Sequence, residues 1–190
     1  MAQDLNNVHA WTGAEVYYAP LGTAPPTDLT TAPAAEWLDL GVIVMDSGAQ
    51  SVDISSDTYK GRAKAGPIPV LTTSTINARK ITIAVMEENK NVLKLLEPLT
   101  TSTTSTTAPG ETTIQHRQSD YSTRYALLIC AYSGSTLKRR WTAPAAQPSP
   151  TDLRAFFGDE PGSDTLEWSI FPDGSGFYAT EITNDPAMTP

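Results

Sequence analysis

The chain is poor in the residues that carry most enzyme and metal chemistry. Among its 190 residues there are one cysteine and two histidines. Cys130 cannot form an internal disulfide, and its apolar neighbours indicate a buried thiol that acts as a small hydrophobic group. His9 and His116 fall in predicted loops and show no spacing that a zinc site uses. The sequence therefore predicts no metal centre and no cofactor.

Common catalytic and nucleotide-binding motifs are also missing. There is no Gly-x-Ser-x-Gly turn for acyl transfer and no glycine-rich loop of the kinds that bind phosphates. Glu160 and Glu167 could form the carboxylate pair of a glycosidase, but their spacing alone cannot show such a pair. Asp173 and its glycine neighbours lack the alternating oxygen ligands of a calcium loop, so we interpret them as a turn. We therefore predict that the protein has no catalytic residues and is not an enzyme.

Long hydrophobic runs are absent as well. No stretch of about 18 apolar residues occurs, so we expect no span of a bilayer and no membrane partner. The composition of 39% hydrophobic and 18% charged residues is nevertheless that of a folded protein with a real core.

Basic residues are missing from both ends of the chain. Residues 1–59 contain eight acids and no Lys or Arg, and residues 155–190 contain seven acids and no base. All thirteen bases lie between Lys60 and Arg154. The net charge of −8 argues against a protein that binds nucleic acid tightly, because such a protein needs clustered cations to neutralise phosphates. The acidic ends and the basic middle can pair within one subunit or between copies in a head-to-tail assembly, and both interpretations stay open.

The sequence does contain a series of short β-strand patterns and one amphipathic helix. The helix is expected at residues 87–97, with Glu87 and Glu88 in its first turn and Pro98 as its stop. The strands are expected at residues 14–19, 37–45, 51–55, 70–76, 80–86, 124–132, 136–142, 166–171 and 177–182. This pattern predicts a mainly β protein, an antiparallel β-sandwich or barrel with one flanking helix.

We expect a single domain over residues 1–190, with an extended N-terminal arm at about 1–13. Clusters of proline, glycine, serine and threonine predict exposed loops at about 55–69, 99–112 and 143–150. A short helical element is expected at 152–157. A hairpin turn is expected at 172–176, with its Asp-Gly pair supplying the positive φ.

Four sequence segments, taken in order, resemble those of a known protein family. They are AEVYYAPLGTAPPTD at residues 14–28, EWLDLG at 36–41 with DSG at 46–48, MEEN opening the helix at 86–89, and WSIFPDGSG at 168–176. Each of these sequence segments is short, and the similarity rests on their order and spacing along the chain. Together they resemble the major tail tube proteins of long-tailed bacteriophages, particularly those that infect actinobacteria.

The resemblance implies a structural role. Proteins of this family form a β-sandwich or barrel, six copies extend their sheets into a ring, and stacked rings form a tube that conducts DNA. An acidic lumen would repel phosphates, so genomic DNA would pass without specific binding. The expected partners are further copies of the chain and the tape measure, tail terminator and distal tail proteins. The expected location is the virion tail, after synthesis in the host cytoplasm.

Contacts between subunits are expected in the basic segment at 59–64 and in the N-terminal arm. The residues concerned are His9, Trp11, Tyr59, Lys60, Arg62 and Lys64.

Two other classes of protein fit the same pattern. One is another virion β protein, such as a tail terminator or a head decoration protein. The other is a carbohydrate-binding or cell-surface-binding β-sandwich, which usually displays clustered aromatic side chains. The four tryptophans here are scattered, and most of them fall in or beside predicted strands, which favours packing in the core.

Overall fold

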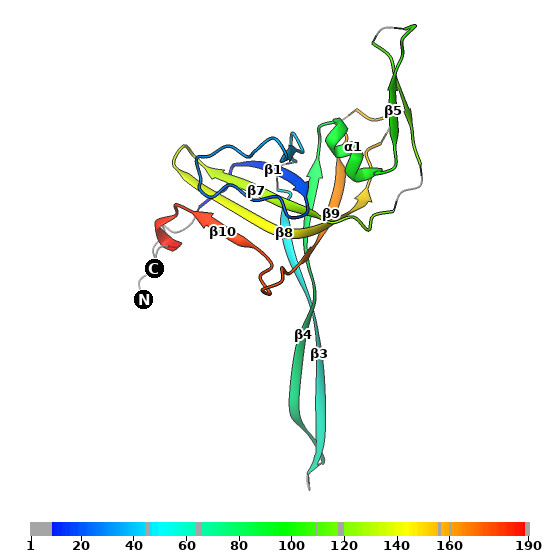
Figure 1. The fold of residues 1–190 in the computed structure, drawn as a ribbon. Coiled ribbons are helices and arrows are strands. Elements are labelled where there is room, and N and C mark those ends of the chain that lie inside the picture. Colours follow the sequence, from blue (N-terminus) through cyan, green and yellow to red (C-terminus); the bar gives the residue numbers. More distant parts are fainter. Residues whose placement is uncertain are drawn as a thin grey trace.

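A computed structural model describes residues 9–44, 46–63, 66–108, 110–117, 120–155, 157–159 and 161–188, with backbone alone for 57–63 and 66–77. The described chain is mainly β, with antiparallel strands and one α-helix (Figure 1). The elements are β1 (Gly13–Pro20), β2 (Leu38–Asp39), β3 (Ala49–Ala63), β4 (Gly66–Val85), α1 (Lys90–Leu96), β5 (Thr101–Thr104), β6 (Thr112–Gln115), β7 (Tyr125–Ser133), β8 (Leu137–Asp152), β9 (Asp164–Phe171), β10 (Thr180–Thr183) and a final 3-10 turn (Pro186–Met188). No described helix is long and apolar enough to cross a membrane.

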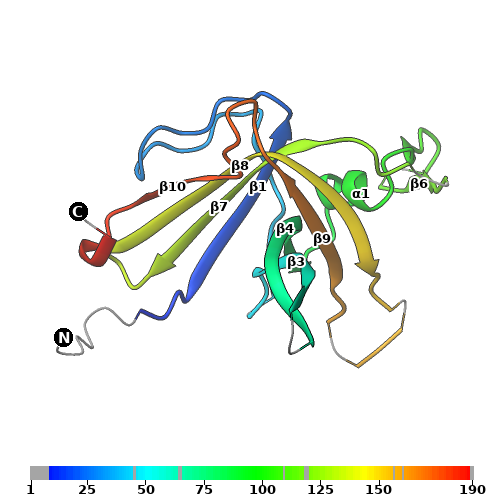
Figure 2. The ribbon, with the colours of Figure 1, turned by 90° about the horizontal axis from the view of Figure 1, so that it is seen from below.

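One antiparallel sheet forms the body, in the order β2-β1-β7-β8-β9-β4-β3. β8 is its central strand, because β7 pairs with its first half and β9 with its second half. β10 continues along the same edge of β8 as β9: Phe171 lies opposite Ala145, and Thr180 lies opposite Thr142. The sheet is strongly curved around this shared strand (Figure 2).

A short segment at residues 38–44 closes the curved sheet into a barrel. At its start, Leu38 pairs with Tyr18 of β1. At its end, Ile43 bridges to Val85 of β4, and the Val44 amide donates to the Ala84 carbonyl at 2.8 Å. The segment therefore connects the two outer strands of the body, and this confirms the predicted antiparallel β-sandwich or barrel with one helix.

The core fills the inside of this barrel. Leu166, Trp168 and Ile170 alternate inward along β9, and β4 presents Ile81, Ile83 and Val85 beside them. The inward-facing residues of α1 add to the same cluster from one end of the barrel. They are Val92, Leu95 and Leu96. Each fully buried large side chain stabilises the fold by about 1.5–3 kcal/mol.

A second, smaller cluster lies on the other face of β1 and β7. Trp37 packs there with Leu128 and Cys130, so the cysteine is buried as predicted. The segment at residues 21–37 covers this cluster, and the Trp37 indole donates to the Ala24 carbonyl at 3.1 Å. The buried Arg140 guanidinium donates to the carbonyls of this covering segment, at 3.0 Å to Thr31. An acidic surface segment is thereby tied to the sheet by a buried cation.

The helix begins later than predicted. Asn89 is its N-cap, and its side chain accepts from the amides of Asn91 and Val92 at 2.9 and 3.0 Å. Glu87 and Glu88 therefore lie before the helix and not in its first turn. Asparagine is among the best N-cap residues, whereas Glu87 instead accepts the Val42 amide at 3.2 Å.

Two of the three predicted loops are strand, whereas the described part of 99–112 is strand only at Thr101–Thr104 and Thr112 and is mostly exposed. The region 55–69 belongs to β3 and β4, which stay paired up to Ala63 and Gly66. Prolines are tolerated there because, within the described residues, no strand pairs with the other edge of β4 before Arg79. The region 99–112 contributes to a small hairpin of β5 and β6, since threonine has a high β propensity. The region 143–150 is the centre of β8.

Three further local predictions were wrong. The segment expected as a strand at 37–45 pairs with β1 only at Leu38–Asp39, because Gly41 has a φ of 79° and turns the chain toward β4. No described residue of 152–157 is helical. The turn at 172–176 exists, but Gly176 supplies its positive φ of 86°, and the strand after it pairs with β8.

Candidate assembly surfaces

The most prominent surface is a two-stranded ribbon that projects from the barrel (Figure 1). It consists of β3 from Asp53 onward and of the part of β4 before Arg79, which pair with each other and with no other described strand. An isolated ribbon is only marginally stable in water, and its open edges can pair with another chain. Val52 and Ile54, in the strand expected at 51–55, are 44% and 56% exposed. These properties are those of a surface that another molecule covers.

Three of the six predicted contact residues fall at the far end of this ribbon. Tyr59, Lys60 and Arg62 are on β3, opposite Leu71 and the two prolines of β4. Their side chains lie outside the described part of the chain, and Lys64 lies outside the described residues altogether. Their contacts therefore stay a prediction.

The other two predicted residues, His9 and Trp11, contact their own chain. His9 Nε2 is 3.3 Å from a carboxylate oxygen of the buried Asp185. The Trp11 ring lies 4.5 Å from the guanidinium carbon of Arg139, which also pairs with Glu181 at 2.9 Å. The described end of the arm is thus attached beside β10 and β8, away from the tip of the ribbon.

Two strand edges on opposite sides of the sheet are free of partners within the described residues. β10 pairs with β8 on one side only. On the other side of the sheet, β2 pairs with Tyr17 and Tyr18 of β1, and Leu40 donates to Val16 at 2.9 Å, which leaves Gly13–Glu15 unpaired along their outer edge. Sequence patterns could not locate these edges, because they depend on which distant strands pair.

Acidic side chains lie on and near the covering segment at residues 21–37. Asp28 accepts from the amides and hydroxyls of Thr30 and Thr31, and these hydrogen bonds hold the pKa of its carboxyl well below its usual range. Tyr132 donates to Glu15 at 2.9 Å, and partial burial together with this carboxylate raises the pKa of Tyr132 to about 12. The Asp28 carboxylate therefore stays charged at neutral pH, whereas the Tyr132 phenol stays neutral.

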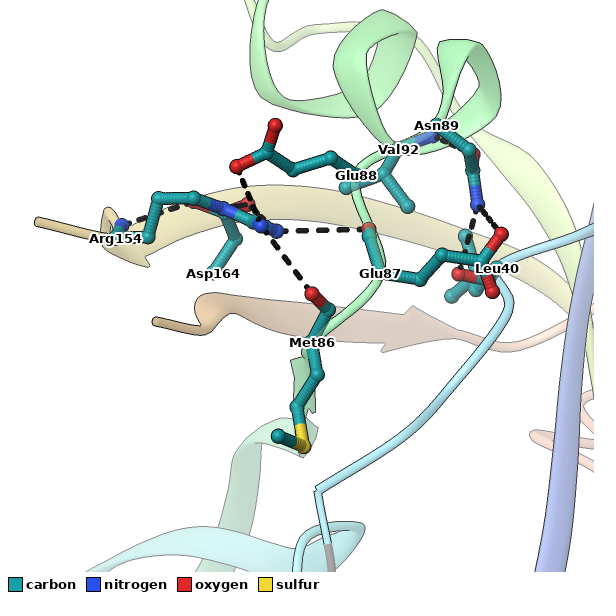
Figure 3. A network of polar contacts seen from close by, with 8 residues as sticks. All are labelled: Leu40, Met86, Glu87, Glu88, Asn89, Val92, Arg154 and Asp164. Carbon is teal, nitrogen blue, oxygen red and sulfur yellow. Dashed lines mark hydrogen bonds and ion pairs between the residues drawn. The ribbon is translucent and has the colours of Figure 1, made fainter. Parts of the chain in front are cut away.

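A buried ion pair anchors the end of the barrel at which α1 begins (Figure 3). Arg154 Nε donates to Asp164 Oδ2 at 2.7 Å, and the Arg154 backbone amide donates to Asp164 Oδ1 at 3.0 Å. The same guanidinium reaches the Met86 carbonyl at 3.2 Å and Glu88 Oε1 at 2.8 Å. The connection between β8 and β9 is thereby fastened to the segment between β4 and the helix.

Of the two carboxylates considered for a glycosidase site, the structure describes only Glu167. Glu167 pairs with Lys80 across the sheet at 2.8 Å, and Glu160 lies outside the described residues. Within the described residues, no group of three or more His, Cys, Asp or Glu side chains could hold a metal ion. Trp37 and Trp168 are buried, so neither can stack on a sugar.

A family model described as "Phage tail tube protein" matches residues 1–167. No curated protein matches the chain. Among solved structures, the chain is similar to the "Cryo-EM structure of the anti-feeding prophage cap (AFP tube terminating cap)", with 15% identity, a TM-score of 0.42 and coverage of 96% of this chain and 95% of that one.

Proposed function

Because the chain belongs to the phage tail tube protein family, and is thus a structural component of a virion tail, we propose that it self-assembles into stacked hexameric rings that form the tail tube. The observation that carries this proposal is the pair of unused strand edges on opposite sides of one sheet. The sequence segments shared with tail tube proteins support a long-tailed phage of an actinobacterial host.

Ring formation follows from joining those edges. The outer edge of β10 in one subunit adds to the outer edge of β1 in the next, so that the sheets continue around the ring. Closure of the ring removes the open edges that would otherwise promote aggregation. The two edges differ, so the contact is heterologous, and a suitable rotation between neighbours closes it. The number six rests on the family resemblance.

Stacking uses the ribbon of β3 and β4. Its described far end carries Lys60 and Arg62, and we propose that these bases and Lys64 contact acidic residues of an adjacent ring. When the adjacent ring covers Val52 and Ile54, burial of their apolar surface further stabilises the stack. His9 and Trp11 contribute by holding the arm against β10, next to the edge that the neighbouring subunit joins.

The completed tube is proposed to conduct genomic DNA during ejection without binding it specifically. The net charge of −8 and the acidic side chains near Asp28 support this role, because negative walls repel phosphates. The tape measure, tail terminator and distal tail proteins are the proposed partners, and assembly begins in the host cytoplasm.

Negative-stain electron microscopy of the purified full-length chain at high concentration tests the proposal. We expect long tubes of stacked rings. Single rings that never lengthen would instead indicate a tail terminator. A monomer that binds glycans on an array would indicate a carbohydrate-binding module.

The role of the ribbon tip is tested by Arg62→Glu. We expect this variant to form shorter or less stable tubes, whereas Lys94→Glu, an equal charge reversal on the exposed side of α1, is the matched control. Arg62→Glu tubes of normal length and salt resistance would refute the role of the tip.

A further inference from the structure

Opposite ends of the barrel carry features that complement each other. β9 runs from Asp164, which lies opposite Val85, to Ile170, which lies opposite Arg79. The connection between β8 and β9 is at the first end, beside Arg154 and the start of α1. The ribbon leaves the barrel at the other end (Figure 1). In a head-to-tail stack, the first end of one subunit faces the second end of the next.

A groove of about 370 Å³ lies at the root of the ribbon. Trp141 and Ile170 line its inner part, and Val52 lines it from β3. Arg79 also lines the groove, with its guanidinium carbon 4.8 Å from the centre of the Tyr178 ring. Glu181 also lines the groove but pairs with Arg139. Within the described residues Arg79 forms no ion pair, so its positive charge favours an occupant that brings a carboxylate.

The opposite end presents an apolar side chain among acids. Phe157, in the connection between β8 and β9, is 93% exposed, and Leu153 nearby is 58% exposed. The carboxylates of Asp152 and Asp159 on either side are exposed too. The nearest base in the sequence, Arg154, is already engaged by Asp164 and Glu88. A large exposed apolar residue with a polar border is typical of a binding surface.

We propose that Phe157 of one subunit inserts into the groove at Arg79 of a second copy in the adjacent ring. The acidic neighbours of Phe157 then face the Arg79 guanidinium, and the aromatic ring covers Trp141 and Ile170. This inference rests on the proposed function, because the two surfaces meet only when copies stack head to tail. A contact between two different surfaces propagates without closing and so favours an open filament.

Cross-linking of two single substitutions tests the contact. Phe157→Cys and Val52→Cys chains are assembled separately and as a mixture, then treated with a short bismaleimide. We expect covalent dimers in the mixture and none in either chain alone, since the native Cys130 is buried. Ile114→Cys replaces Phe157→Cys in the control mixture, because Ile114 is an exposed apolar residue on a different hairpin. That mixture should give no dimer.

Assembly provides a second readout. Phe157→Ser should raise the critical concentration for tube formation roughly tenfold or more, as expected for loss of a buried aromatic side chain. Leu99→Ser, a matched change at an exposed leucine, should leave it unchanged. A Phe157→Cys chain that folds but does not assemble, beside an Ile114→Cys chain that does, also supports the contact.

The two proposals fail in different ways. If the Phe157→Cys and Val52→Cys chains assemble into tubes but their mixture gives no dimer, or if Phe157→Cys cross-links to itself, the contact is wrong while the tail tube function stands. If the wild-type chain forms neither rings nor tubes at any concentration, the proposed function is overturned and this contact with it.

Discussion

Replacing Arg154 by methionine tests whether the ion pair with Asp164 anchors the end of the barrel. The Arg154 side chain is 18% exposed and that of Asp164 is 6% exposed, so the pair is largely removed from water. Breaking a buried pair leaves the other charge without a partner, which costs about 3–5 kcal/mol. We expect Arg154→Met to lower the free energy of unfolding by about 3 kcal/mol, near the lower limit because part of the guanidinium is hydrated.

The loss of stability in Arg154→Met should come from its buried partner Asp164 and not from its exposed partner Glu88. Glu88 is 75% exposed, so Glu88→Gln should change the free energy of unfolding by about 0.5 kcal/mol or less. Asp164→Asn keeps an oxygen that accepts the Arg154 backbone amide. The double variant Arg154→Met, Asp164→Asn should therefore be more stable than Arg154→Met alone, because it no longer buries an unpaired charge.

Urea unfolding of the unassembled chain measures these differences. Tryptophan fluorescence can report on it, since Trp168 is fully buried in the core. Measurements are made at concentrations below those at which the chain assembles. An Arg154→Met variant within about 1 kcal/mol of the wild type, or a double variant less stable than the single one, would refute this account of the pair.

Three further predictions concern local conformation and pH. Gly41→Ala should destabilise the fold by more than Gly48→Ala. Both glycines have φ near +80° to +90°, but only at Gly41 would an added Cβ meet a neighbouring carboxylate. Equal losses of stability in urea unfolding would exclude that clash. Asn89→Ala should cost about 1 kcal/mol through loss of the N-cap, and unchanged stability would contradict that role. The raised pKa of Tyr132 favours the neutral phenol in the folded state. The stabilisation that this phenol gives is complete below pH 10 and is lost as the pH rises toward about 12. Tyr132→Phe should therefore make the free energy of unfolding less dependent on pH between these values.

Burial patterns made the centre of the barrel predictable. The alternation of Leu166, Trp168 and Ile170 indicated a strand with one buried face, and the structure confirms it. The spacing of Val92, Leu95 and Leu96 located the helix in the same way. Such patterns arise where one side of an element faces a core, and they are the strongest signals in a sequence.

The candidate assembly surfaces could not be predicted in the same way. The ribbon of β3 and β4 has no core to face, so its glycines and prolines resemble those of a loop. The free edge of β10 exists because this strand pairs with β8 and does not fold back on β9, and this pairing depends on tertiary packing. Exposure of Phe157 likewise depends on how Arg154 holds the connection in which it lies.

The course of β8 has a mechanical consequence. This single strand belongs to both halves of the sheet, and its middle contains Pro144, Pro148 and Pro150. Each proline ring fixes one backbone torsion, so the strand is stiffer than one of ordinary composition. The prolines therefore limit how far this strand can flex where the two half-sheets meet. In a tube built from such subunits, the same stiff strand recurs in every copy, and resistance to bending becomes a property of each monomer as well as of the contacts between them.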